Sequence, residues 1–535
     1  MSQPSAAATF TFSLPSPSRY GPRIGSILYR RPGVSSEPIQ IQTPGLLTAT
    51  SRGVVPHLSR DNHRATSAIR WVNVPFETFL EHNPPLPTLQ PGPNPLHTFL
   101  GFTPGKHLLS MSARDPYDGR EMPANSVNHV SVYSLRGVRK LSPSDWRSYV
   151  QACQPDVVFA LSDTPFTDPP YSQKRMTKSI DRSATWLSTI LKPKEGEHPP
   201  NVFVHMAGGT SLAARKAFSD SLVERLYGPE ADAVAPLVTL DEGVTGYSVD
   251  LVPLRQSLEA EERKNPRTSS PSDLNPVIPS HTEQIIPLLK SSFASVPETK
   301  PRLVNSTESP HEILQYISSV GIDLFDAHWA QRAADIGVAL DFEFPVRHSS
   351  GDKRDIGHNL YDTRYALDLK PFADAFRGAL ADDSSSALPV CRCLACSPFH
   401  PATRIYHGYD TPEHSGLPAR DPDSGPHYKP PHTRAYIHHL LHTHEMSAHT
   451  LLVMHNLEVL DAFFAGIRHV IAEHPERWTE EVEKFFRRYD SDTRVFTAAK
   501  ESWKSVELAR GKGRLAREKG KQEETTLGTV VETDD

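Results

Sequence analysis

The feature that most constrains the fold is an alternation of short apolar segments with amphipathic stretches over most of the first 345 residues. Predicted buried strands are 157–161, 201–207, 235–240 and 301–305, and predicted helices are 176–191 and 211–227. Strands separated by amphipathic helices are typical of βα units on a parallel sheet. With this many units the sequence predicts an α/β fold built as a (β/α)8 TIM barrel, and periodicity leaves a doubly wound sheet as the alternative.

The segments outside this alternation define the expected domain organisation. We expect a flexible N-terminus over 1–20 and a barrel domain over 21–385 that opens with a β-hairpin or meander. A cysteine-bearing subdomain over 386–475 includes a long helix at 435–473, and a helical extension follows at 476–507. Two polar, proline-rich segments, 256–280 and 397–431, are interpreted as surface insertions, the second of them disordered, and 508–535 as a charged disordered tail.

Composition excludes several classes of protein. The mean hydropathy is −0.44, and no apolar run is expected to span a bilayer, so the sequence predicts no integral membrane association. A net charge of −6 over 535 residues does not indicate a basic nucleic-acid-binding domain, so RNA contact requires a local patch or a partner. The first twenty residues share their serine content with transit peptides, but a frayed start before a hairpin explains them better.

Three of the four cysteines crowd together as Cys391-x-Cys393-x-x-Cys396. This spacing lets a tight turn wrap one tetrahedral ion while a fourth ligand arrives from elsewhere, and zinc is the expected occupant. Spacing alone leaves the fourth ligand open among six downstream histidines, which are His407, His427, His432, His438, His439 and His455. The tract His438, His439, His442, His444 and His449 is better explained as a mixture of core and surface imidazoles than as a second metal site.

The cysteine motif, followed by HTRAYIHHLL (432–441) and MHNLEVL (454–460), resembles the zinc subdomain of the tRNA-guanine transglycosylase family. Further resemblance covers RIGSILYRR with IQTPGLL near the start, AGGTSLAARKAFSDSLVE (207–224) and VGIDLFDAHWAQRAADIGVAL (320–340). The resemblance implies a TIM barrel with a zinc subdomain, one structural Zn²⁺ per subunit, and His455 as the fourth ligand.

The family's chemistry exchanges guanine for queuine at the wobble position of tRNA, with one aspartate as nucleophile and another as general acid/base. The resemblance places Asp326 at the nucleophile position. The D-S-G-G-F-Q segment that carries the second aspartate is replaced by GKHLLSMSARDP (105–116), and Ala207 stands where a base-recognising glutamine is expected. We therefore expect no catalytic residue, with Asp326 as a vestige, and a structural role in backbone hydrogen bonds is its alternative.

Two more positions are candidates for substrate or tRNA binding. Asp163 lies near the family's purine-recognising aspartate, although a turn or helix N-cap role explains it equally well. Arg332 matches the first of two phosphate-gripping arginines, while Asp335 reverses the charge of the second.

The resemblance is closer to the family's eukaryotic non-catalytic subunit than to its catalytic subunit. It implies a heterodimer with the catalytic subunit of queuine tRNA-ribosyltransferase, tRNA contact through that complex, and an interface on the helix 435–473. The expected location is the cytoplasm, with peripheral association at the mitochondrial outer membrane as an addition. The alternatives are an independently active transglycosylase that uses Asp326, and a zinc-containing scaffold unrelated to tRNA modification.

Overall fold

The computed structural model describes residues 9–31, 33–34, 37–165, 169–194, 199–264, 281–347, 352–377, 388–397 and 432–507. The described chain forms two compact units. The first comprises residues up to 329 with 344–348 and 460–486, and the second comprises 330–343, 349–459 and the residues from 487 onward. Segments from both sides of residue 385 contribute to each unit, whereas the domains expected from the sequence were 21–385, 386–475 and 476–507.

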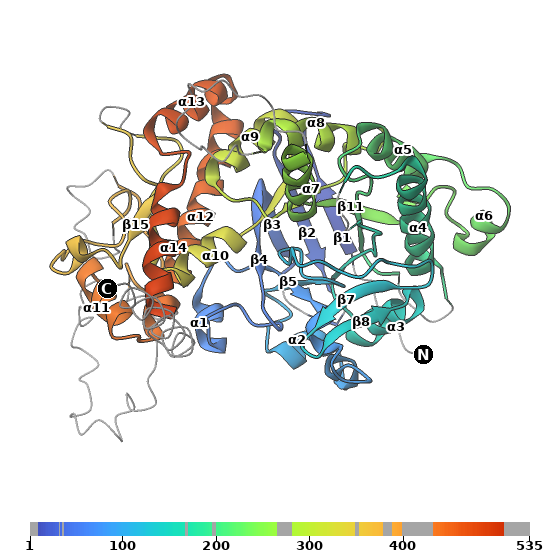
Figure 1. Ribbon diagram of the computed structural model, residues 1–535, viewed down its shortest axis with the longest axis horizontal. Coiled ribbons are helices and arrows are strands. Elements are labelled where there is room, and N and C mark those ends of the chain that lie inside the picture. The colour runs from blue at the N-terminus through green and yellow to red at the C-terminus, as the bar shows by residue number, and fades with distance from the viewer. Residues whose placement is uncertain are drawn as a thin grey trace, which may run out of the picture. The chain divides into compact units, whose positions relative to one another are not determined.

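The first unit is a closed barrel of eight parallel strands, as the sequence predicts (Figure 1). In order around the barrel the strands are β4 (Gly45–Ala49), β5 (Trp71–Pro75), β6 (Leu108–Ser112), β9 (Val157–Phe159), β10 (Val202–His205), β11 (Val244–Asp250), β12 (Arg302–Asn305) and β13 (Leu324–Asp326), which pairs with β4. Every strand is almost wholly buried, which explains why apolar residues occur on both faces of the strands instead of on one face only. The doubly wound alternative is excluded by the closure.

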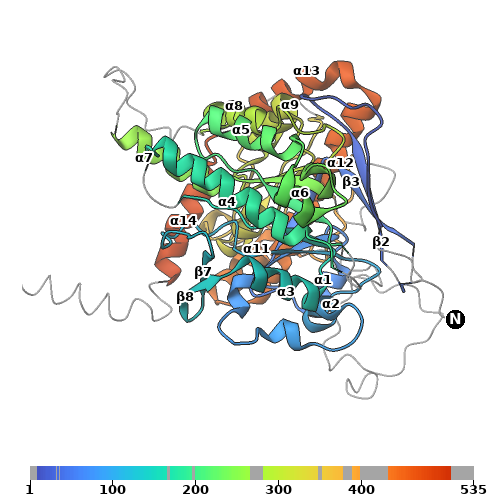
Figure 2. The same ribbon diagram turned by 90° about the vertical axis from the view of Figure 1, so that its right-hand side faces the viewer.

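Helices surround the strands, and serine caps begin many of them. The hydroxyls of Ser142, Ser172, Ser211 and Ser309 each accept a hydrogen bond from the backbone N–H three residues later, which satisfies a donor that the helix itself leaves unpaired. Figure 2 shows α3 (Pro143–Cys153) beside α4 (Gln173–Leu191), and α5 (Leu212–Val223) beside α8 (Thr282–Ser292). The helices of this unit are α1 (Arg60–Ala65), α2 (Pro95–Leu100), α3 (Pro143–Cys153), α4 (Gln173–Leu191), α5 (Leu212–Val223), α6 (Gly228–Val234), α7 (Leu251–Lys264), α8 (Thr282–Ser292), α9 (Pro310–Val320) and all but the last two residues of α13 (Trp478–Arg488).

A three-stranded antiparallel sheet closes the end of the barrel at which the strands begin. Its strands are β1 (Thr9–Ser13), β2 (Gly25–Arg30) and β3 (Ile39–Thr43). Ile27 and Ile41 of this sheet share one buried cluster with residues at or near the strand starts, among them Trp71 and Leu108. The opposite end, where the strands finish, is therefore the one that is left to form a site.

The second unit holds β14 (Val338–Leu340), β15 (Gly357–Asn359), α11 (Arg434–His442), the first part of α12 (Ser447–Glu473) and α14 (Arg494–Glu507). A small hairpin of β7 (Val130–Ser134) and β8 (Gly137–Leu141) belongs to the first unit, and α10 (His328–Asp335) begins there and ends in the second. Helices α13 and α14 occupy the region in which a helical extension is expected.

Several expected boundaries differ from the structure. Residues 9–13, expected to be flexible, form β1, because they pair with β2 along their whole length. Residues 235–240 form no strand: β11 takes the place beside β10, and Pro236 has no N–H to donate to a ladder. Residues 256–264 of the expected insertion continue α7. Residues 265–280, 398–431 and 508–535 lie outside the described residues, as do positions 1–8.

The long helix expected over 435–473 is two helices. His444 has a φ of 62°, and the N–H groups of His444 and Glu445 donate to the carbonyls of Leu441 and Leu440. This pattern ends α11 as a C-terminal cap with a left-handed residue. The second helix, α12, is long and apolar enough by composition to cross a membrane, contrary to the sequence expectation, but 72% of its most apolar window is buried inside the protein.

Candidate functional site

Three thiols and one imidazole form a buried cluster in the second unit. Nδ1 of His455 lies 3.6 Å from Sγ of Cys391, 3.6 Å from Sγ of Cys393 and 3.5 Å from Sγ of Cys396. All four residues are buried. Four ligand atoms around one point, closed to solvent, can hold one metal ion with no open coordination position. The structure thus brings together the three cysteines and the histidine that the family resemblance selects.

The turn that carries the cysteines is fixed by its own backbone. The Cys391 N–H donates to the Arg377 carbonyl at 2.8 Å, and the Ser397 hydroxyl donates to the Cys391 carbonyl at 2.6 Å. Within the turn, the Cys396 N–H points at Sγ of Cys393, 3.3 Å away. These contacts close the chain into a loop whose three sulfurs face a common centre.

The histidine is oriented from its other side. Nε2 of His455 lies 2.9 Å from the Leu340 carbonyl oxygen at the end of β14, so Nε2 carries the proton and Nδ1 presents its lone pair to the sulfurs. The next residue, Asn456, accepts from the Leu340 N–H and donates to the carbonyls of Ala330 and Val338. The spacing of ligand residues gives no signal for Asn456, although it directly follows His455 in the chain.

The thiols cannot all ionise without a cation. Hydrogen bonds from the neighbouring thiols lower the pKa of Cys391 well below its ordinary value, whereas burial raises the pKa of Cys393 well above it. The pKa of Cys396 is raised by its hydrogen bonds to the other two sulfurs. One thiolate therefore disfavours the next, and a bound cation is what would permit three thiolates at this spacing.

Three histidines of the tract on α11 and α12, which are His438, His442 and His449, have backbone carbonyls as partners. A ring nitrogen of His438 lies 2.9 Å from the Leu360 carbonyl, one of His442 lies 3.1 Å from the Tyr361 carbonyl, and one of His449 lies 3.0 Å from the Ala334 carbonyl. His432 stacks on Tyr436. Among the described residues these imidazoles do not gather into a metal-sized group. His407 and His427 lie outside the described residues.

A second group with ligand chemistry, Asp341, His358 and Asp374, is already balanced by cations. Nε2 of His358 lies 2.9 Å from an Asp341 oxygen, and Arg354 reaches the same oxygen at 3.0 Å. Arg434 pairs with Asp374 at 2.8 Å. Burial opposes ionisation of Asp341, but these hydrogen bonds and charges lower its pKa to about 2. The group is an ion-pair network beside the Cys391–His455 cluster rather than a second metal site.

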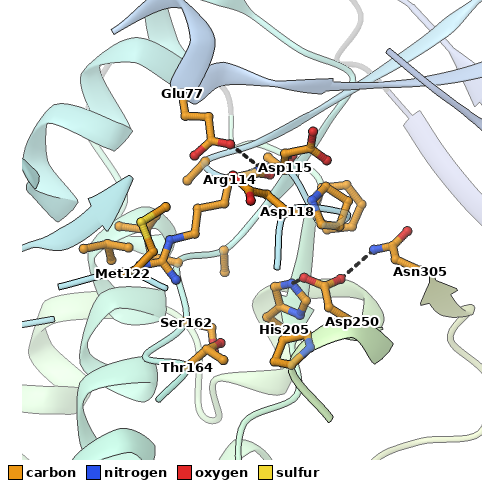
Figure 3. A pocket seen from close by; sticks show the side chains of 18 residues that line it. Glu77, Arg114, Asp115, Asp118, Met122, Ser162, Thr164, His205, Asp250 and Asn305 are labelled. Atoms are coloured by element: carbon orange, nitrogen blue, oxygen red, sulfur yellow. Dashed lines mark hydrogen bonds and ion pairs between the residues drawn. The ribbon is translucent and has the colours of Figure 1, made fainter. Parts of the chain in front are cut away.

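At the barrel mouth, side chains from the strand ends line two small cavities of about 70 Å³ and about 40 Å³. His205 at the end of β10 pairs with Asp250 at the end of β11, 2.7 Å apart, and Asp250 accepts from the Asn305 amide at 2.8 Å. Figure 3 shows these three in a row, with Ser162 and Thr164 near His205. The pair holds the pKa of His205 above its ordinary value despite burial.

The lining of the larger cavity also includes Glu77 and Asp115, with Arg114 beside them, and the sequence did not single these residues out. Burial raises the pKa of Glu77 to about 7 and that of Asp115 to about 6. Glu77 accepts from the backbone N–H groups of Asp115 and Tyr133, both at 2.9 Å. The only signal for Glu77 in the sequence is that it is a lone glutamate in the apolar segment 71–80.

Asp326 lies at the end of β13, fully buried, and lines neither of these two cavities. One oxygen accepts from the Ser306 N–H and the other from the His328 N–H at 2.8 Å. Burial raises the pKa of Asp326 to about 7, although backbone hydrogen bonds from His328, Ser306 and Thr307 work against the rise. The carboxyl is occupied by the backbone, as the structural alternative from the sequence describes.

Asp163 is fully buried just after β9 and is engaged by two arginines. Arg175 donates to it with two nitrogens, each at 2.9 Å, and Arg182 donates at 3.0 Å. Asn125 donates at 2.9 Å to the oxygen Oδ1. Asp163 therefore lies in an ion-pair cluster with two arginines, and side chains of this chain bind both of its carboxyl oxygens.

The remaining positions that the sequence singled out are Ala207 and Arg332. Ala207 and the two glycines after it line the smaller cavity. Gly208 has a φ of 126° and lies so close to Arg215 that a Cβ would meet its backbone nitrogen at 2.6 Å, which explains the glycine there. Arg332 is exposed on α10 and forms an ion pair with Asp335 at 2.5 Å.

Comparison with known proteins gives one family. The family model described as queuine tRNA-ribosyltransferase matches residues 21–237, 276–417 and 427–491. The matched residues include every barrel strand except β11, and also Cys391, Cys393, Cys396 and His455.

Curated relatives resemble the chain over most of its length. The Homo sapiens protein named queuine tRNA-ribosyltransferase accessory subunit 2 is 26% identical to this chain over 454 residues, which cover 80% of this chain and 89% of the relative. The protein of that name from Drosophila persimilis is 24% identical over 458 residues, 85% of this chain and 88% of the relative. The Ixodes scapularis protein is 25% identical over 463 residues, 84% and 94% respectively.

Proposed function

The chain belongs to the queuine tRNA-ribosyltransferase family, and from this premise we propose that it is the non-catalytic subunit of a heterodimeric queuine tRNA-ribosyltransferase. In this proposal a catalytic partner exchanges guanine for queuine at the wobble position of tRNAs with GU(N) anticodons. This chain completes the assembly and contacts tRNA through the complex. The resemblance over most of its length to proteins named as accessory subunits supports the assignment.

The observation that carries the non-catalytic reading is the environment of Asp326. A nucleophilic carboxylate must be ionised and open toward the reacting carbon. Asp326 is fully buried and bonded to backbone N–H groups through both oxygens. The base-binding residues that the family uses are also replaced at 105–116 and at Ala207. We therefore assign Asp326 a structural role in this chain.

We propose zinc as the ion of the Cys391–His455 cluster. Tetrahedral zinc with Zn–S near 2.3 Å and Zn–N near 2.0–2.1 Å requires sulfur–nitrogen separations of about 3.5–3.6 Å. The three separations from His455 Nδ1 are 3.5 or 3.6 Å. An ion held by four protein ligands supplies a structural cross-link between the cysteine turn and α12.

The proposed partner surface lies on the second unit. The sequence predicted an interface on the helix 435–473, but residues 451–460 of that segment are all buried within this chain. The exposed apolar side chains nearby are Leu367 and Leu369, 92% and 77% exposed, with Tyr436 and Met446 on or just after α11. The Ala435 N–H donates to the Asp368 carbonyl at 2.8 Å, so the 366–370 loop adjoins α11. This loop and α11 together offer an apolar surface for a partner subunit.

An exchange assay tests the proposed function. Labelled guanine or queuine is offered to unmodified tRNA with this chain alone, with the catalytic subunit alone, and with both together, and the mixture is weighed by native mass spectrometry with zinc analysis. We expect turnover only with both, in a one-to-one complex. Turnover by this chain alone that Asp326→Ala abolishes would establish an independent enzyme. Absence of any complex, together with normal turnover by the partner alone, would favour a scaffold unrelated to tRNA modification.

A further inference from the structure

A tyrosine ring from the loop after β6 lies beside Asp326 in the barrel mouth. The Tyr117 ring stacks on the His328 ring, with centroids 3.8 Å apart and planes inclined by 9°. Burial and the Asp326 carboxyl raise the pKa of Tyr117 well above its ordinary value, so the phenol stays neutral. The buried Tyr117 hydroxyl has no hydrogen-bond partner among the described residues. The ring is therefore held there by packing and not by a polar contact of its own.

The loop that carries the ring is anchored on several elements. The Asp115 N–H donates to Glu77 after β5, and the Ser306 hydroxyl donates to the Pro116 carbonyl at 3.0 Å. The Gln256 amide on α7 donates to the Gly119 carbonyl at 2.6 Å. A side chain at Gly119 would meet that amide at 2.5 Å, so the loop lies directly against α7. These anchors fix the segment on both sides of Tyr117.

The same two residues that bind Asp326 also hold the loop. The Ser306 N–H donates to one Asp326 oxygen while the Ser306 hydroxyl fastens Pro116. The His328 N–H donates to the other oxygen while the His328 ring stacks on Tyr117. Ser306 has a φ of 70°, an uncommon conformation for a residue with a side chain. The uncommon backbone conformation of Ser306 is explained if its N–H must bind Asp326 while its hydroxyl binds the Pro116 carbonyl.

We propose that Tyr117 is a built-in occupant of the barrel mouth, which fills a planar, aromatic-sized site against His328 and closes it to external ligands. Asp326 acts in this device as a positioning residue, because its two oxygens orient the residues that hold the ring. Removal of the ring opens a site for a flat, neutral heteroaromatic molecule that stacks on His328. This inference concerns the chain's own barrel and holds whether or not the partner in the proposed function is correct.

The experiment removes the ring from the full chain. Tyr117→Ala and wild type are titrated with benzimidazole, chosen as a flat heteroaromatic probe, and binding is followed by calorimetry and by the rise in thermal midpoint. We expect saturable binding by Tyr117→Ala and none by wild type. Adding His328→Ala to Tyr117→Ala is expected to weaken binding by about tenfold, the loss of one stacking contact. Phe293→Ala opens a cavity of similar size elsewhere in the barrel unit, and His328→Ala is expected to leave any binding there unchanged.

Three results would overturn the inference: saturable binding by wild type, no binding by folded Tyr117→Ala, or binding by Tyr117→Ala that is insensitive to His328→Ala. If Tyr117→Ala does not fold, Ser306→Ala provides the second test, since it removes only the hydroxyl that fastens Pro116. Backbone amides of 115–119 are then expected to exchange hydrogen at least about tenfold faster than in wild type. Unchanged exchange in Ser306→Ala would contradict the proposed anchoring.

Discussion

His455 and Leu340 lie 2.9 Å apart through Nε2 and the carbonyl oxygen, and this contact turns the opposite ring nitrogen toward three cysteine sulfurs. The carbonyl belongs to β14 and the histidine to α12, so the metal ligand is oriented by an element 115 residues away in sequence. Metal affinity at such sites depends on the groups that orient the ligands as well as on the ligands themselves.

Cys393→Ser is expected to abolish stoichiometric metal binding, because a closed four-ligand site loses one thiolate. Metal content of the purified protein by plasma mass spectrometry should fall from one ion per chain to much less than one, and the thermal midpoint should fall with it. Cys153→Ser is the matched control, since Cys153 is buried in the first unit, far along the chain from the cluster. Full metal content in Cys393→Ser would rule out its role as a ligand.

Asn456→Ala is expected to destabilise the protein while leaving the four ligands in place. The substitution leaves three backbone groups, at Ala330, Val338 and Leu340, without their side-chain partner. Each buried polar group left unpaired costs about 1–3 kcal/mol. Urea denaturation gives the free energy of unfolding, and a change below about 0.5 kcal/mol would show that the amide contacts are dispensable.

The stability conferred by Asp326 is expected to decrease as the pH rises. Burial raises its pKa in the folded protein to about 7, whereas an unfolded aspartate has a pKa of about 3.9. The folded state binds the extra proton between these values, so wild type is favoured below this window and loses that advantage as the pH rises through 7. Relative to Asp326→Asn, the unfolding free energy of wild type should fall between pH 5 and pH 8, values chosen to bracket the folded pKa of about 7.

Asp232→Asn, at an exposed position on α6, serves as the control for that measurement. Its difference from wild type should stay nearly constant over the same pH range. A difference between wild type and Asp326→Asn that is likewise constant would mean that Asp326 does not titrate in the folded protein near neutral pH.

Tyr117→Phe is expected to leave the stability unchanged or to raise it by about 1 kcal/mol. The hydroxyl is buried without a partner, so its removal relieves a desolvation cost and keeps the ring that stacks on His328. Chemical denaturation measures the effect. A loss of more than about 1 kcal/mol would indicate that the hydroxyl makes a bond through a buried water, and the ring would then not be held by packing alone.

Leu367→Glu combined with Leu369→Glu is expected to weaken association with the catalytic subunit at least about tenfold, because two charges would replace exposed apolar side chains in the proposed interface. Native mass spectrometry of the co-purified subunits measures the effect. Leu135→Glu, at an exposed leucine in the turn between β7 and β8, should leave the complex intact. An unchanged complex in the double variant would move the interface away from this loop.

The sequence by itself determined the barrel, since buried parallel strands need continuous apolar segments and their covering helices need a period near 3.6. It also determined the three cysteines, because their spacing within one turn is a local property. Two features could not be predicted from the sequence. The strand beside β10 is β11 instead of 235–240, and the segment 435–473 divides into two helices at His444. A loop and a buried strand can have the same apolar content, and a histidine rather than a glycine took the left-handed position.

Tertiary structure decided the chemical state of the retained side chains. The sequence indicates Asp326 and Asp163 as candidate site residues, but in the structure both accept hydrogen bonds from groups elsewhere in the chain. Asp326 accepts from Ser306, and Asp163 accepts from Asn125 and from two arginines of α4. Whether a carboxyl is open or occupied depends on which donors the fold brings within about 3 Å. Likewise, the packing of β14 against α12 brings His455 within hydrogen-bond distance of Leu340. The local sequence does not indicate this contact, because the direction of a hydrogen bond depends on three-dimensional position.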